Sequence, residues 1–193
     1  MALQKYTGFS KNKVVGMAGI LDSSRFKYFL SLELKVHPYK IKSFVLGGHG
    51  DTMVSMVNHT KVDGKNLSDL IKSGNISQNK VEEIVERTKN GGAEIVKHLQ
   101  KGSAFYAPAS SGIEMAESYL KDQKKELPCA AYLQGEYGVK DLYVGVPVII
   151  GKKGVEKVVQ INLDEKEKKL FQNSIKAVNC LLYTSDAADE DLR

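Results

Sequence analysis

The second half of the sequence holds three strand-like stretches that follow one another too closely for parallel pairing. We predict strands at residues 127–134, 142–150 and 155–161 from their β-branched and other apolar residues. Glycine-containing turns at residues 135–138 and 151–154 separate these strands. Parallel neighbours need a crossover of about a dozen residues, so the three strands are expected to form an antiparallel sheet.

Helical patterns precede this sheet in the sequence. Apolar residues at helical spacing predict a helix over residues 23–36. A longer helix is expected after Ser77, which is a good N-cap residue, and its apolar face extends to Leu99. Gly91 and Gly92 lie inside that helix and cost about 1 kcal/mol of helix propensity each. They therefore indicate either a kink or a close backbone approach.

Two further helices are expected nearer the C-terminus. Pro108 can occupy the first turn of one of them. The inner face of that helix is predicted to consist of Ile113, Ala116, Tyr119 and Leu120. Asp164 and Glu167 have the spacing of a capping box for a final helix that runs through Val178.

The remaining elements are short. Strands are predicted at residues 13–19, 43–46 and 53–61, and residues 2–7 are interpreted as the last turns of a helix that ends at Gly8. Mixed helices and an antiparallel sheet indicate an α+β domain. The sequence lacks the glycine-rich strand-to-helix turn, followed about 20 residues later by an acidic residue, that a dinucleotide-binding fold requires.

Composition excludes several classes of protein. With 42% hydrophobic and 26% charged residues, the 193-residue chain can build one globular core. The sequence shows no secretory signal and no apolar run of about 20 residues for a membrane span, so we expect a cytoplasmic protein. The net charge of +5 comes from lysines interspersed with acidic residues, a pattern that argues against nucleic-acid binding. Cys129 and Cys180 have no metal-ligand spacing and are expected to be free thiols.

Both ends of the sequence indicate a fragment of a longer protein. Residues 1–179 are interpreted as the domain, whereas residues 180–193 resemble the translation of a sequencing adapter more than a natural protein tail. Residues 186–193 carry a net charge of −3, which leaves +8 for the preceding chain. A natural acidic tail is the alternative. The predicted first helix has no beginning, which suggests that Met1 is internal to a longer gene.

Two groups of residues can carry chemistry. His49 lies among glycines, which allow a substrate to approach closely, and an imidazole titrating near neutrality is a common general acid or base. Asp22 and Arg25 are three residues apart, so they share one face at a helix start. Taken alone, His49 could equally be a turn residue, and Asp22 and Arg25 could form an ordinary surface ion pair.

Three sequence blocks together resemble the active-site motifs of the lactate/malate dehydrogenase family. Residues 15–26 are VGMAGILDSSRF, residues 47–54 are GGHGDTMV, and residues 101–108 are KGSAFYAP. The resemblance extends over residues 2–179 and is greatest to the malate dehydrogenase branch, because lactate enzymes usually carry Glu at the position of Gly48. It implies the family's C-terminal catalytic domain, without the N-terminal Rossmann domain that holds most of the NAD site.

The resemblance also implies roles for individual residues. His49 would exchange the substrate hydroxyl proton, and Asp22 would orient and stabilise its imidazole. Arg25 would bind the C1 carboxylate of a small dicarboxylate substrate through two parallel hydrogen bonds. Ala104 would line the substrate pocket, while Met17 and Pro108 would lie near the nicotinamide ring of NAD.

Three interpretations of the chain remain open. The first is the catalytic half of an NAD-dependent L-malate dehydrogenase, which would work as a homodimer or homotetramer. The second is a fragment of a dehydrogenase for lactate or another 2-hydroxy acid. The third is a catalytically silent assembly module. The loop whose arginines distinguish malate from lactate in this family would precede Met1.

Overall fold

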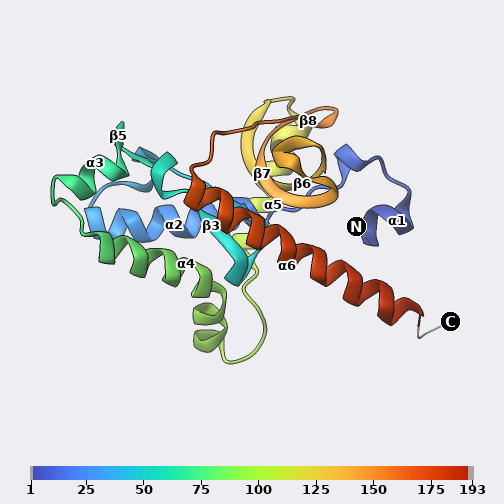
Figure 1. Cartoon of the computed structure of the whole chain (residues 1–193), viewed down its shortest axis with the longest axis horizontal. Helices are drawn as coiled ribbons and strands as arrows, with labels where there is room; N and C mark the ends of the chain where they lie inside the picture. Colours follow the sequence, from blue (N-terminus) through green and yellow to red (C-terminus); the bar gives the residue numbers. More distant parts are fainter. Residues whose placement is uncertain (1, 191–193) are drawn as a thin grey trace.

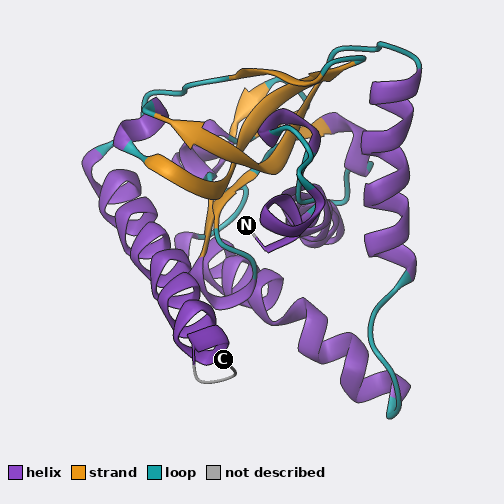
Figure 2. Ribbon diagram, turned by 90° about the vertical axis from the view of Figure 1, so that its right-hand side faces the viewer, coloured by secondary structure: helices purple, strands orange, loops and turns teal. Residues whose placement is uncertain are grey.

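The computed structural model describes residues 2–190, and the side chains of residues 2–181. It shows two sheets with helices packed around them (Figures 1 and 2). The five strands of the larger sheet are β2 (Val45–Gly47), β3 (Met53–Ser55), β6 (Lys125–Gln134), β7 (Lys140–Gly151) and β8 (Gly154–Val158). Every pairing in this sheet is antiparallel, as predicted from the short turns.

Strand β7 is the centre of the larger sheet. It pairs with β6 along most of its length, and its other edge is shared by β2 and β8. Gly47 of β2 is paired with Gly145 of β7. A Cβ atom at Gly145 would lie 2.4 Å from the carbonyl oxygen of Gly47, so the strands can meet here only because Gly145 has no side chain.

Helices on both sides of the larger sheet bury its apolar residues. Leu133, Val146 and Val148 form the centre of this core. Ile20 reaches it from α2 (Ala18–Leu34), and Phe171 reaches it from α6 (Glu165–Glu190). The fold is therefore the predicted arrangement of mixed helices on an antiparallel sheet.

A second core lies on the other side of α2. Phe26 and Leu30 of α2 are fully buried there. The other strands and helices that contribute side chains to this core are β1 (Ile41–Lys42), β4 (Lys61–Val62), α3 (Leu67–Lys72) and α4 (Gln78–Leu99). Strand β5 (Lys65–Asn66) pairs with β4, and both of its residues are exposed. Because α2 has apolar residues towards both cores, it is held between them and provides a rigid support for its polar residues.

The prediction of one strand at residues 53–61 is wrong. The chain leaves the larger sheet after Ser55, makes a 3-10 turn at Val57–His59, and enters the smaller sheet at Lys61. The hydroxyl group of Thr60 donates a hydrogen bond to the carbonyl of Met56 and closes this crossing. Met56 belongs to the core of the larger sheet, whereas Val57 packs against the second core, so the chain changes direction between them.

The prediction of a strand at residues 13–19 is also wrong. Gly16 makes a single antiparallel bridge with Ala130, and α2 already begins at Ala18, five residues before the expected start. The helix can begin there because Gly19 lies directly against the backbone of Pro128. A side chain at this position would collide with that carbonyl group at 2.5 Å.

The predicted inner face of α5 (Tyr106–Leu120) is partly wrong. Ile113 and Leu120 are 66% and 78% exposed. Tyr119 packs against the core of the larger sheet as predicted, and Met115, which was not predicted, packs there as well. Ser118 is buried because its hydroxyl group donates to the Ile150 carbonyl and accepts from the Lys125 N–H, which lets a polar residue occupy the inner face.

The predicted helix ends are confirmed. The Ser77 hydroxyl accepts a hydrogen bond from the Lys80 N–H at the start of α4. At the start of α6, Asp164 accepts from the Glu167 N–H at 2.8 Å, and Glu167 accepts from the Asp164 N–H at 3.0 Å. The first helix, α1 (Ala2–Thr7), ends at Gly8 with φ +68°.

The predicted change of character after residue 179 falls mostly outside the described side chains. Cys180 and Leu181 are exposed, and the described backbone continues α6 to Glu190. The interpretation of residues 180–193 as a foreign tail therefore stays a prediction. None of the described helices is apolar over a length that would cross a membrane.

Candidate active site

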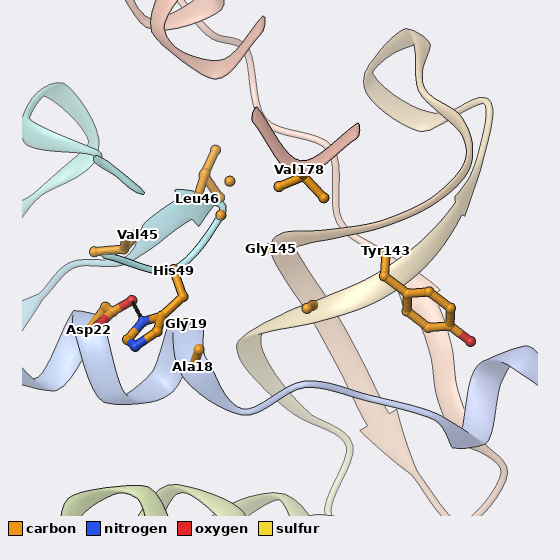
Figure 3. Close-up of a pocket in the computed structure, with 12 residues that line it drawn as sticks. Ala18, Gly19, Asp22, Val45, Leu46, His49, Tyr143, Gly145 and Val178 are labelled. Carbon is orange, nitrogen blue, oxygen red and sulfur yellow. Dashed lines mark hydrogen bonds and ion pairs between the residues drawn. The ribbon is translucent and has the colours of Figure 1, made fainter. Parts of the chain in front are cut away.

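His49 and Asp22 meet although 27 residues separate them in the sequence. Asp22 lies in the second turn of α2, and its side chain is 1% exposed. His49 follows β2 and precedes the 3-10 turn Gly50–Thr52. The imidazole Nδ1 lies 2.7 Å from the Asp22 Oδ2. A dashed line marks this contact in Figure 3.

This contact determines the tautomer of the imidazole. A carboxylate can only accept hydrogen bonds, so Nδ1 carries the hydrogen and the neutral ring has its lone pair on Nε2. The hydrogen bond to Asp22 raises the pKa of His49 above its usual 6.5, against a smaller opposing effect of burial. His49 is 53% exposed, so a second molecule can reach the ring. The pair is therefore arranged so that Nε2 can take a proton from a second molecule, or return a proton to it.

Arg25 lies one helical turn after Asp22 and completes the group. Its terminal nitrogen NH1 is 3.5 Å from the Asp22 Oδ1, and its side chain is mostly buried. The Nε atom is buried and has no hydrogen-bond partner among the described residues. A buried N–H donor without a partner lowers the stability of the folded protein, and a bound carboxylate would accept a hydrogen bond from it.

The helix α4 leaves room for Arg25. A Cβ atom at Gly91 would lie 3.1 Å from the Arg25 Cδ, whereas one at Gly92 would lie at an ordinary 3.7 Å from NH1. Of the two possibilities predicted for this glycine pair, the close approach is confirmed, since α4 is continuous through both residues. The backbone of α4 can thus approach the Arg25 side chain closely because residue 91 has no side chain.

A cavity of about 180 Å³ lies beside the histidine loop. Asp22, Gly48 and His49 line it from α2 and the loop, and Val178 and Gly145 line it from α6 and β7 (Figure 3). Arg25 does not belong to its lining. His49 and Asp22 thus lie at this cavity, whereas Arg25 lies beside it, towards α4.

The other three predicted residues do not line this cavity, although Met17 directly precedes Ala18, which does. Met17 is partly exposed at the N-cap position of α2. Ala104 lies in the loop between α4 and α5, and Pro108 lies in the first turn of α5. The structure thus brings His49, Asp22 and Arg25 together, and it leaves the roles of the other three as predictions.

Two buried serines near His49 were missed in the sequence. Ser23 accepts a hydrogen bond from the Val45 N–H at the start of β2, and Ser174 accepts one from the Gly48 N–H. One signal was available for Ser174. It lies at helical spacing between Phe171 and Val178, as a polar residue within the apolar face of α6.

Residues 20–181 match the model of the lactate/malate dehydrogenase α/β C-terminal domain. Over 192 residues, 100% of the chain, the sequence is 65% identical to a malate dehydrogenase of Pelagibacter ubique (strain HTCC1062), of which it covers 60%.

Solved structures show the same relationship. A malate dehydrogenase of Cryptosporidium parvum has a TM-score of 0.93 and 45% identity, over 95% of this chain and 59% of its own. A lactate dehydrogenase of the same organism, complexed with lactic acid and nicotinamide adenine dinucleotide, has a TM-score of 0.93 and 44% identity over 95% and 58%. A malate dehydrogenase of Salinibacter ruber has a TM-score of 0.92 and 43% identity over 98% and 60%. The chain thus spans about 60% of the length of these relatives.

Proposed function

Because the chain belongs to the lactate/malate dehydrogenase family and matches its C-terminal domain over residues 20–181, we propose that it is the catalytic domain of an NAD-dependent malate dehydrogenase. The single observation that carries this proposal is the 2.7 Å contact between His49 and a buried Asp22, with Arg25 one turn away. In the family's reaction, His49 would be the proton acceptor, Asp22 would orient its imidazole, and Arg25 would bind a carboxylate of the substrate.

The proposed mechanism assigns one task to each side chain. His49 Nε2 takes the hydroxyl proton of malate, and it returns a proton in the reduction of oxaloacetate. Asp22 holds Nδ1–H and stabilises the imidazolium that forms. Arg25 binds the C1 carboxylate, using the Nε donor that has no partner among the described residues. The chemistry that NAD supplies when bound is the acceptance of a hydride from the substrate carbon.

The described residues fit only part of an NAD site. All their strand pairings are antiparallel, so they offer no parallel dinucleotide-binding sheet. Met17 directly precedes the helix that carries Asp22, and Pro108 is partly exposed at the start of α5. We propose that both contact the nicotinamide, that Ala104 lines the substrate pocket, and that the rest of the NAD site lies in the family's N-terminal domain.

Gly48 supports malate over lactate. A Cβ atom at this position would lie 2.5 Å from the Thr52 Oγ1 and 3.2 Å from Val178. The glutamate expected here in lactate enzymes would therefore require the loop or α6 to move. A lactate dehydrogenase is kept as the second candidate, because the lactate enzyme of Cryptosporidium parvum matches this structure as well as the malate enzyme does.

The proposal also includes an assembled, cytoplasmic enzyme without nucleic-acid or membrane partners. Four large apolar side chains in and just before α5 are exposed, a number that favours a protein partner such as a second subunit. They are Phe105, Tyr106, Ile113 and Leu120.

The test uses a fusion enzyme. The part of the Pelagibacter ubique malate dehydrogenase that this chain does not match is joined to the chain, and NAD reduction is measured with L-malate and with L-lactate. We expect a clear preference for malate and a loss of about 10²–10⁴-fold in kcat for His49→Asn, the scale for removing a general base. Preference for lactate would establish the second candidate. Equal activity of the fusion enzyme and its His49→Asn variant would refute the mechanism.

A further inference from the structure

The peptide that precedes His49 is held by a helix far away in the sequence. The Gly48 N–H donates a hydrogen bond to the Ser174 Oγ at 2.8 Å, across 126 residues. Ser174 lies in α6, and the residue is 2% exposed. The bond is partly buried, so removing the Ser174 hydroxyl group would deprive the Gly48 N–H of its partner among the described residues.

The contact is also sterically close. Gly47 has φ +86°, and a Cβ atom there would lie 2.2 Å from the Ser174 Oγ and 2.9 Å from its Cβ. The backbone of Gly47 and Gly48 thus rests directly on Ser174. The serine limits how far the loop can move towards α6, and its hydrogen bond limits how far it can move away.

The helix α6 is itself anchored independently of this contact. Its capping box joins Asp164 and Glu167, and the Asn58 side-chain amide donates to the Asp164 Oδ2 at 2.7 Å. Phe171 then packs into the core of the larger sheet, one turn before Ser174. Ser174 therefore has a fixed place from which it can act on the loop.

The other end of the same strand is held by a second serine. Ser23 accepts from the Val45 N–H at 3.0 Å and donates to the Gly19 carbonyl at 2.6 Å. The strand β2 is thus tied to α2 before His49 and to α6 at His49. The imidazole, which is half exposed, makes one side-chain hydrogen bond among the described residues, and its partner is Asp22.

We propose that Ser174 is a positioning residue for His49, because it fixes the Gly47–Gly48 backbone at the distance that keeps the imidazole Nδ1 bonded to Asp22. This role rests on the proposed function of His49 as the proton acceptor. Ser174 touches neither substrate nor cofactor in this role. It acts through the peptide of Gly48.

Ser118 provides a matched control. It is buried and hydrogen-bonded through its hydroxyl group to Ile150 and Lys125, at a place in α5 remote from His49 in the sequence and absent from the cavity lining. Ser118→Ala and Ser174→Ala each remove one buried hydroxyl group. A general loss of stability should appear in both variants, whereas an effect on His49 should appear only in Ser174→Ala.

The first experiment uses the 193-residue chain and needs no activity. The imidazole titration of His49 is followed by NMR, with His49→Asn to assign its signal. We expect a midpoint above 6.5 in the unmodified chain and a decrease of about 0.5 pH units or more in Ser174→Ala, because a looser loop weakens the bond to Asp22. Ser118→Ala should leave the midpoint unchanged. Hydrogen exchange of the Gly48 amide in the unmodified chain provides a second measurement, with slow exchange expected.

The second experiment measures the fusion enzyme. Ser174→Ala should lower kcat for malate about 5- to 30-fold with KM changed less than about twofold, the pattern for a misplaced catalytic group with intact substrate binding. Ser118→Ala should keep both values. An unchanged His49 titration and unchanged kcat in folded Ser174→Ala, or a rapidly exchanging Gly48 amide, would overturn the proposal. An inactive unmodified fusion enzyme would count against the proposed function, while the NMR result would still decide the role of Ser174.

Discussion

At the scale of single residues, the proposed chemistry depends on one hydrogen bond between a half-exposed imidazole and a buried carboxylate. That bond raises the pKa of His49 above 6.5. His49 must be neutral to accept a proton, so malate oxidation by the fusion enzyme should decline as the pH falls through this raised pKa. Oxaloacetate reduction should decline as the pH rises through the same value.

Asp22→Asn tests this assignment, since the amide keeps the shape but loses the charge. We expect the midpoint of kcat/KM for malate to move to lower pH, together with a large loss of rate from the altered tautomer. The same raised pKa makes a contribution to folding stability that is present below 6.5 and lost as the pH rises through the folded value. A pH profile of kcat/KM with an unmoved midpoint in Asp22→Asn would contradict the role of the pair.

Arg25→Lys tests the carboxylate receptor. A lysine keeps the positive charge but cannot make two parallel hydrogen bonds, and it lacks an Nε donor in the guanidinium plane. The KM of the fusion enzyme for malate should rise about 10-fold or more, on the scale of one lost charge-assisted hydrogen bond. The unchanged charge makes the comparison specific to geometry. A KM equal to that of the unmodified enzyme would remove Arg25 from the substrate site.

At the scale of elements, the site depends on helices that pack around its side chains. Gly91 of α4 faces Arg25 at a distance that a methyl group would make tight, whereas Gly92 leaves ordinary van der Waals space. Gly91→Ala should raise the KM for malate about 3- to 10-fold by displacing the guanidinium, on the scale of a small misplacement of a binding group. Gly92→Ala should leave KM unchanged.

Each substitution should also stabilise α4 by up to about 1 kcal/mol, because alanine has a higher helix propensity than glycine. Chemical denaturation of each variant therefore separates helix stability from the position of Arg25. If both variants raised KM equally, a general stiffening of α4 would explain the result, and the specific contact with Gly91 would be unimportant.

At the scale of the whole molecule, the chain carries the residues proposed for proton transfer but matches only about 60% of its relatives' length. The 193-residue chain by itself should neither bind NADH in isothermal titration calorimetry nor oxidise malate. Size-exclusion chromatography should show self-association, because Phe105, Tyr106, Ile113 and Leu120 are exposed together near α5. Micromolar NADH binding by a monodisperse monomer would contradict both expectations.

The sequence by itself determined the class of fold and the chemistry-bearing residues. Short glycine turns allowed only antiparallel strands, and Ser77, Asp164 and Glu167 marked helix starts that need no distant partner. His49, Asp22 and Arg25 were found because three blocks together resemble one family. Periodicity alone would have left each of them an ordinary turn or surface residue.

The tertiary structure decided what depends on contacts between distant segments. Residues 53–61 do not form one strand, because Met56 belongs to the core of the larger sheet and Val57 packs against the second core. Ser118 is buried on α5 because it bonds to distant backbone groups, while Ile113 remains exposed. The hydrogen bond between Gly48 and Ser174 joins residues 126 apart. Local patterns report which backbone conformation is favoured, but only packing determines which polar group finds its partner across the fold.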